Sequence, residues 1–170
     1  MGLRSRLFGR TSSPAVADYE RHVGHPVQVL AEASGPRVAL LAMPAAFAVS
    51  FDGAWQTIGW HQVRTGGWKL ETDEMYWRLL DGRSDSLVLT DEGHFPETFR
   101  DRVQASVVVE ERVPVPSGGA VVLSARRDLG QDQPVLDWQM QASHGASLKD
   151  PETLRLAEDV LARLRADYDF

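Results

Sequence analysis

The chain of 170 residues contains no cysteine. This absence excludes disulfides, zinc sites built on thiolates and catalysis by a cysteine nucleophile, and it fits a reducing cytoplasm. No apolar run approaches the roughly 18 residues that a membrane span needs. The net charge of −6 opposes general affinity for nucleic acid, because phosphates would be repelled. We therefore predict a cytoplasmic protein with no transmembrane segment and no nucleic-acid partner.

Recognisable catalytic and cofactor motifs are missing too. The sequence has no Gly-x-Ser-x-Gly or Ser-x-x-Lys pattern for an activated serine. It has no Gly-x-Gly-x-x-Gly or Walker loop for a nucleotide, and no His-Glu-x-x-His pair for zinc. We predict a protein without catalytic residues, cofactor or metal. A hydrolase that uses His94 or His144 is the weakest of the alternatives that stay open.

The N-terminus is basic and contains some apolar residues. Residues 1–13 are expected to form a mobile tail, with an ordinary disordered terminus as its simplest interpretation. If this tail were helical, it could contact an anionic membrane surface through the side chains of Arg4, Arg6, Phe8 and Arg10. The alternative locations are thus free in the cytoplasm or peripheral to a membrane.

Short strands dominate the chain after a first helix over residues 14–23, where Ser13 is the expected N-cap. Asp52-Gly53 predicts a two-residue hairpin, and Thr65-Gly66-Gly67 is interpreted as another turn. Turn signals recur every 8–12 residues or so, which favours an antiparallel meander that closes as a barrel or sandwich. The predicted strands lie at 27–33, 37–43, 47–51, 55–60, 68–70, 75–80, 86–90, 107–113, 120–127 and 134–140.

Two further helices complete a mainly β (α+β) fold. Residues 96–106 begin with Pro96 and an acid in the first turn, as helices often do. Residues 151–168 follow Asp150, a good N-cap, and repeat apolar side chains with a helical period. This amphipathic helix should lay one face on a sheet. No linker interrupts the pattern, so residues 14–170 are predicted to form a single globular domain.

Four of the five tryptophans fall between residues 55 and 77, among residues that favour strands. Most of these rings should fill the core, because each one buries a large apolar area. Trp55 and Trp60 are five residues apart, so strand alternation places them on opposite faces of the sheet. One of the two should be more exposed, which makes Trp55 and Trp60 the candidates for contact with a partner.

Four arginines form a candidate anion site. Arg100 and Arg102 lie on the predicted helix, and Arg126 and Arg127 end a predicted strand. If the fold brings the helix and the strand end together, guanidinium groups could bind a small anion. Salt bridges to Glu110, Glu111 or Asp128 are the simpler interpretation.

The segments "IGWHQVRTGGW", "SLVLT", "FPETFRDRVQASVVV" and "VVLSARRD" occur in this order. In order and character, roughly residues 30–127 resemble a family of small actinobacterial cytoplasmic proteins with a bacterial pleckstrin-homology-like (PH-like) barrel. The resemblance implies a seven-stranded barrel that is closed at one end by a helix, here Pro96 to Ser106. The hairpins and second helix after residue 107 depart from this pattern. The fold hosts both lipid-binding and protein-binding functions.

The function predicted from these observations is a non-enzymatic binding or scaffold domain. Its partner would be another protein or an anionic membrane surface. The alternative is a small-ligand pocket protein or an enzyme of helix-grip type, because a long helix follows three antiparallel strands. In that case a deep cavity should be lined by Trp138, Met140 and Leu161.

Overall fold

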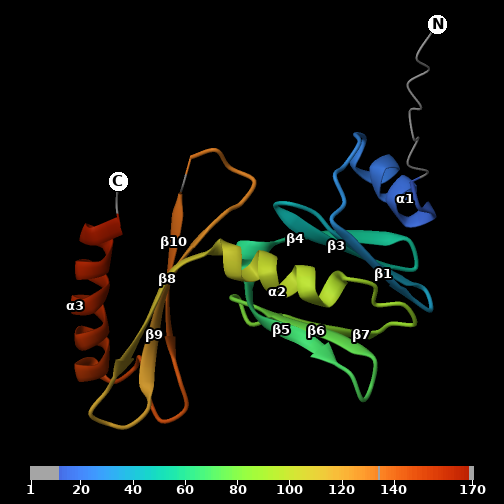
Figure 1. The fold of residues 1–170 in the computed structure, drawn as a ribbon. Helices are drawn as coiled ribbons and strands as arrows, with labels where there is room; N and C mark the ends of the chain where they lie inside the picture. The colour runs from blue at the N-terminus through green and yellow to red at the C-terminus, as the bar shows by residue number, and fades with distance from the viewer. Residues whose placement is uncertain (1–11, 134, 169–170) are drawn as a thin grey trace, which may run out of the picture.

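The computed structural model describes residues 12–133 and 135–168, which fold into two lobes joined by a short connection (Figure 1). The N-terminal lobe comprises residues 12–106, and the C-terminal lobe comprises residues 107–133 and 135–168. The described residues are mainly β, with three antiparallel sheets and three α-helices. None of these helices combines the length and the apolar character that crossing a membrane requires.

Seven strands precede the helix that ends the N-terminal lobe. They form a four-stranded sheet in the order β1-β2-β3-β4 and a three-stranded sheet in the order β5-β6-β7. The elements are α1 (Pro14–Val23), β1 (Ala31–Gly35), β2 (Val38–Ala42), β3 (Ala46–Phe51), β4 (Ala54–Gly59), the 3₁₀ turn η1 (Trp60–Gln62), β5 (Val63–Lys69), β6 (Glu74–Leu79), β7 (Ser84–Val88) and α2 (Phe95–Ser106). The predicted hairpin joins β3 to β4, where Asp52 and Gly53 both have positive φ.

An aromatic core fills the space between these two sheets. Phe47 lies at its centre, with ring centroids 5.1 Å from Trp60, 5.4 Å from Trp77 and 5.5 Å from Phe99. Because Phe99 belongs to α2, this helix lies between the two sheets and contributes its apolar face to the same core (Figure 1). The prediction that most of the tryptophan window fills the core is confirmed.

A closed barrel, which the resemblance implies, is not found among the described residues, because the strands form three separate sheets. Strand β4 does not pair with β5; instead the chain turns through η1 and starts the second sheet. At the opposite side, Ser34 on β1 forms an isolated bridge with Asp91, which follows β7 in the chain. The side chains of α2 occupy the space between the sheets, so the core is completed by a helix face.

The turn predicted at Thr65-Gly66-Gly67 is wrong, since these residues lie inside β5 and pair with β6. The physical reason is the close approach of other groups to Gly66. A Cβ at this position would lie 2.7 Å from Cζ of Phe99 and 2.7 Å from the carbonyl oxygen of Tyr76. Glycine is needed here for space at a helix contact and not for reversal of the chain.

Helix α1 packs on the outer face of the four-stranded sheet. Ser13 is its N-cap, as predicted, and the Ser13 side chain accepts a hydrogen bond from the backbone of Val16. Tyr19 is buried against the sheet and shares a hydrogen bond of 2.7 Å with Thr57. The first strand begins at Ala31, later than the predicted residue 27, because residues 27–30 pack against this helix region without forming a strand.

The C-terminal lobe has its own core. Strands β8 (Val107–Pro114), β9 (Ala120–Arg127) and β10 (Leu136–Ala142) form a sheet in the order β10-β9-β8, and α3 (Pro151–Tyr168) covers one face. The predicted N-cap is confirmed, because Asp150 accepts hydrogen bonds from the backbone and hydroxyl of Thr153. Position 134, where the last strand was predicted to begin, lies outside the described residues.

Candidate functional site

The structure separates the four arginines of the candidate anion site. Arg102 and Arg127 line one pocket of about 430 Å³. Arg100 is exposed and lies 3.5 Å from Asp101. Arg126, in contrast, is buried and does not line that pocket. The fold therefore does bring the end of β9 near α2, but the pocket they form contains only two of the four guanidinium groups.

The two candidate tryptophans differ in exposure, but Trp60 lies in η1 and not on β4 with Trp55, so alternation along one strand is not the cause. Trp60 has no exposed surface, and its Nε1 donates a hydrogen bond of 2.8 Å to the carbonyl of Met43. Trp55 is half-buried beside α1, where its Nε1 donates to Asp18 at 2.8 Å. Only Trp55 can meet a partner at the surface of this fold. The candidate membrane contacts Arg4, Arg6, Phe8 and Arg10 lie outside the described residues.

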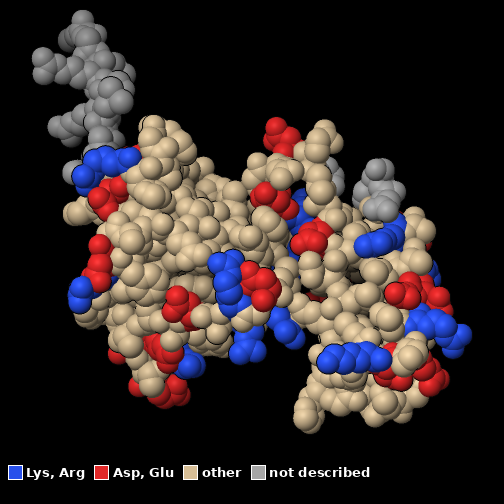
Figure 2. Space-filling view, turned by 180° about the vertical axis from the view of Figure 1, so that it is seen from behind, with Lys and Arg blue, Asp and Glu red and all other residues tan. Residues whose placement is uncertain are grey.

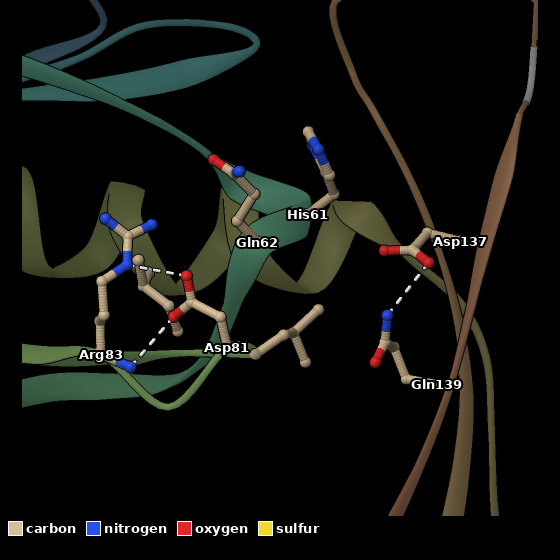
Figure 3. A pocket seen from close by; sticks show the side chains of 8 residues that line it. His61, Gln62, Asp81, Arg83, Asp137 and Gln139 are labelled. Carbon is tan, nitrogen blue, oxygen red and sulfur yellow. Dashed lines mark hydrogen bonds and ion pairs between the residues drawn. The ribbon is translucent and has the colours of Figure 1, made fainter.

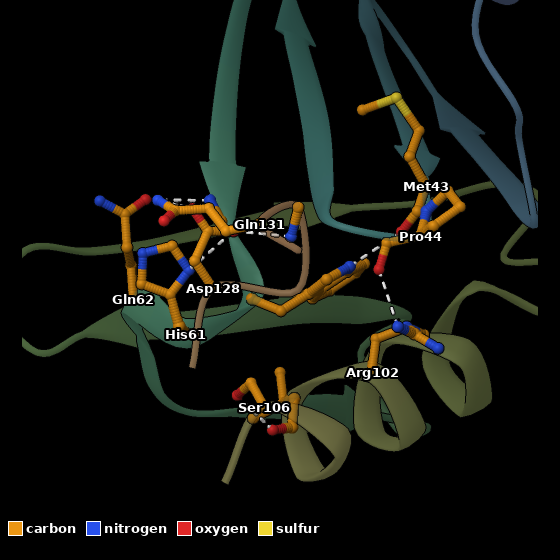
Figure 4. A network of polar contacts seen from close by, with 12 residues as sticks. Met43, Pro44, His61, Gln62, Arg102, Ser106, Asp128 and Gln131 are labelled. Atoms are coloured by element: carbon orange, nitrogen blue, oxygen red, sulfur yellow. Dashed lines mark hydrogen bonds and ion pairs between the residues drawn. The ribbon is translucent and has the colours of Figure 1, made fainter. Parts of the chain in front are cut away.

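A polar junction lies where the two lobes meet. It is made by η1, the C-terminal half of α2, the β9–β10 loop and β10 (Figures 3 and 4). In Figure 2 the surface is indented between the lobes, with basic and acidic side chains intermixed nearby. We call this region the interlobe junction. Of this region the sequence predicts only the arginines of α2 and β9 as a candidate site, because the other residues are far apart along the chain and share no motif.

Few direct contacts hold the junction together. Nη2 of Arg102 donates to the carbonyl of Pro44 at 2.8 Å, which fixes α2 to the four-stranded sheet (Figure 4). Across the lobes, Nδ1 of His61 lies 3.7 Å from Oδ1 of Asp128. A Cβ at Gly130 would lie 3.1 Å from the Cβ of Ala45, so the β9–β10 loop packs closely on the N-terminal lobe.

A pocket of about 360 Å³ opens between the lobes (Figure 3). Most of its polar side chains already have one partner each. Arg83 is 2.7 Å from Oδ2 of Asp81, and Gln139 donates to Oδ1 of Asp137 at 3.0 Å. The pocket therefore contains acidic and basic side chains as well as hydrogen-bond donors and acceptors. The lining residues are His61, Gln62, Leu79, Leu80, Asp81 and Arg83 from the N-terminal lobe, and Asp137 and Gln139 from the C-terminal lobe.

Buried polar atoms without a hydrogen-bond partner concentrate at this junction. Within residues 12–133 and 135–168 there are four such side-chain atoms: Nδ1 of His61, Nε of Arg102, and Nε and Nη1 of Arg126. Buried polar groups in folded proteins are nearly always paired, and leaving one unpaired costs free energy. These atoms belong to η1, α2 and β9, so both lobes contribute them.

Arg126 is the most unusual of these residues. It is only 5% exposed, and it is the strand partner of both Val107 on β8 and Asp137 on β10. Burial lowers the pKa of its guanidinium, and the nearby charges of Glu110 and Asp137 oppose that effect. Directly paired strand residues share a face. Arg126 and Asp137 therefore both point away from α3, on the face of the sheet that contributes to the pocket.

The junction presents charged and hydrogen-bonding side chains from both lobes. Among the described residues, no group of three or more His, Asp or Glu side chains is placed to hold a metal ion. In the described part of the chain, His61 and Asp128 are the one pair of an imidazole and a carboxylate at the junction. Comparison with known proteins finds no matching family model, curated protein or solved structure.

Proposed function

We propose that this protein is a non-enzymatic binding domain that recognises a protein partner at the interlobe junction. The observation that carries the proposal is the concentration of the unpartnered buried polar atoms of the described chain at His61, Arg102 and Arg126. A partner that supplies acceptors there would recover the free energy that these groups lose in the isolated protein.

The mixed charge of the junction favours a protein over an anionic membrane. Asp81, Asp128 and Asp137 lie among Arg83 and Arg102. An anionic lipid surface attracts clusters of lysine and arginine, and interspersed carboxylates weaken that attraction. Protein interfaces, in contrast, commonly match charges of both signs.

The proposal retains the likeness of the N-terminal lobe to a PH-like fold, in an open form. Its support is the order of elements: seven strands, divided between a four-stranded and a three-stranded sheet, precede α2. The isolated Ser34–Asp91 bridge brings the two sheets together at one side. In this proposal the C-terminal lobe is an addition that creates the junction.

No observation favours the helix-grip alternative to the same degree. Trp138 and Met140 pack against the cluster that contains Leu161, so side chains occupy the region where a ligand cavity was predicted. The two lobes instead place their polar pocket on the opposite face of the β8–β10 sheet, at Asp137 and Gln139.

Affinity capture with a matched pair of variants tests the proposal. Gln139→Arg puts a long charged side chain into the pocket, while Gln56→Arg makes the same change at an exposed position on β4. Binding of a specific protein should be lost with Gln139→Arg and kept with Gln56→Arg. A parallel flotation assay uses phosphatidylserine vesicles. Equal capture by both variants, or recruitment to vesicles in place of a protein, would refute the proposal.

A further inference from the structure

We infer that Arg126 anchors a subsite for a carboxylate group of the partner, next to the interlobe pocket. This inference rests on the proposed function and names the chemistry that the junction recognises. The Arg126 side chain is only 5% exposed. Within the described chain its Nε and Nη1 have no hydrogen-bond acceptor.

The protein itself leaves the Arg126 guanidinium without a full set of hydrogen-bond acceptors. Nε and Nη1 together carry three N–H donors in the fixed geometry of arginine. The carboxylate nearest in strand register is Asp137, but its Oδ1 accepts a hydrogen bond from Gln139 at 3.0 Å, and no hydrogen bond joins it to Arg126. Glu110 also contributes only through its charge. A buried charge without hydrogen bonds is costly, so an external acceptor has a large advantage here.

The charges around Arg126 determine which anion fits the subsite. Guanidinium groups bind planar carboxylates and phosphates through paired hydrogen bonds. Glu110 and Asp137 place two negative charges beside Arg126. A phosphate group carries about 1.5 to 2 negative charges at neutral pH, so these two acids repel it more strongly than a singly charged carboxylate. The electrostatics of the site therefore select a carboxylate.

The interlobe pocket lies next to Arg126. Asp137 lines the interlobe pocket and is also the cross-strand neighbour of Arg126. The pocket therefore borders the buried guanidinium across the Asp137 side chain. Gln139 keeps Asp137 turned to its own strand through the 3.0 Å hydrogen bond. A partner carboxylate that enters the pocket, from an acidic side chain or a C-terminus, reaches Arg126 when the Asp137 side chain that separates them moves aside.

NMR on the intact protein tests the subsite directly. Acetate and inorganic phosphate are the two probes, and the side-chain Nε–H signals of Arg126 and Arg127 are followed in ¹H–¹⁵N spectra. Acetate should shift the Arg126 signal with saturation and leave the exposed Arg127 signal nearly unchanged. A larger response to phosphate than to acetate would overturn the choice of carboxylate. No saturable shift with either probe would overturn the subsite.

Two variants separate this inference from the proposed function. Arg126→Met should weaken acetate binding by roughly tenfold or more, the effect of losing a charged hydrogen bond. Arg126→Lys keeps the charge without the fork and should also bind acetate more weakly. In these variants acetate binding is followed through the side-chain amide signal of Gln139, which lines the pocket and is kept when Arg126 is replaced. If both variants keep the acetate response of the wild type at this signal, the subsite is wrong even where partner capture depends on Gln139. If acetate binds at Arg126 but Gln139→Arg leaves partner capture intact, the subsite stands and the proposed function fails.

Discussion

Replacement of Gly66 by alanine should destabilise the N-terminal lobe. The added Cβ would lie 2.7 Å from both Cζ of Phe99 and the carbonyl oxygen of Tyr76. The carbonyl belongs to the β5–β6 ladder and cannot yield freely. Overpacking of a core costs about 1–3 kcal/mol, and Gly→Ala returns about 0.4–1 kcal/mol by restricting the unfolded chain. We expect a net loss of about 1–2 kcal/mol in the free energy of unfolding.

Gly67→Ala is the matched control on the same strand. Its Cβ would lie 3.2 Å from Oη of Tyr76, the far end of a side chain that can turn aside. The free energy of unfolding should therefore stay within about 0.5 kcal/mol of the wild-type value. Urea unfolding followed by tryptophan fluorescence measures both variants, since Trp60 and Trp77 are in the core. Equal losses for the two variants would refute the helix-contact explanation.

Three further predictions concern stability. Trp60→Phe removes the hydrogen bond to Met43 and leaves that carbonyl unpaired, so urea unfolding should show a loss of about 2–3 kcal/mol; an unchanged midpoint would contradict this packing. Hydrogen bonds from Thr153 lower the pKa of Asp150. The ionised carboxylate therefore contributes to the free energy of unfolding above the unfolded pKa near 4, and this contribution is lost as the pH falls through the lower folded pKa. Asp150→Asn should therefore reduce the pH dependence of the melting temperature between pH 5 and 2 or so; an identical pH profile would argue against it. Arg126→Met should raise stability by about 1–4 kcal/mol, because an unpaired buried charge is removed; a clear loss in thermal melting would instead indicate a structural role.

Local chemistry explains why much of the fold could be predicted. The caps Ser13 and Asp150 each act within three residues of their position, and Asp52-Gly53 determines a turn by itself. The pair Gly66-Gly67 is typical of a turn in sequence. The actual role of Gly66 depends on Phe99, which is 33 residues later and belongs to α2. The arrangement of the sheets also depends on such distant contacts. This is why the sequence does not reveal that β4 and β5 remain unpaired.

The candidate site was only partly accessible from the sequence. Asp137 and Gln139 alternate with Trp138 and Met140 on β10, so the pattern could have indicated one polar face and one apolar face. Arg126 was among the four predicted arginines, yet its burial and missing acceptors appear only in three dimensions. His61 belongs to the other lobe, and no sequence signal connects it to β10. The interlobe junction could therefore be identified only from the three-dimensional structure.

The most direct test of the account places a photocrosslinking amino acid at position 139 in the intact protein. Position 56, an exposed glutamine on a different strand and outside the junction pockets, receives the same amino acid as a control. Irradiation in cells should give a specific protein adduct from position 139 and none from position 56. The same adduct from both positions, or an adduct from position 56 alone, would contradict recognition at the interlobe junction.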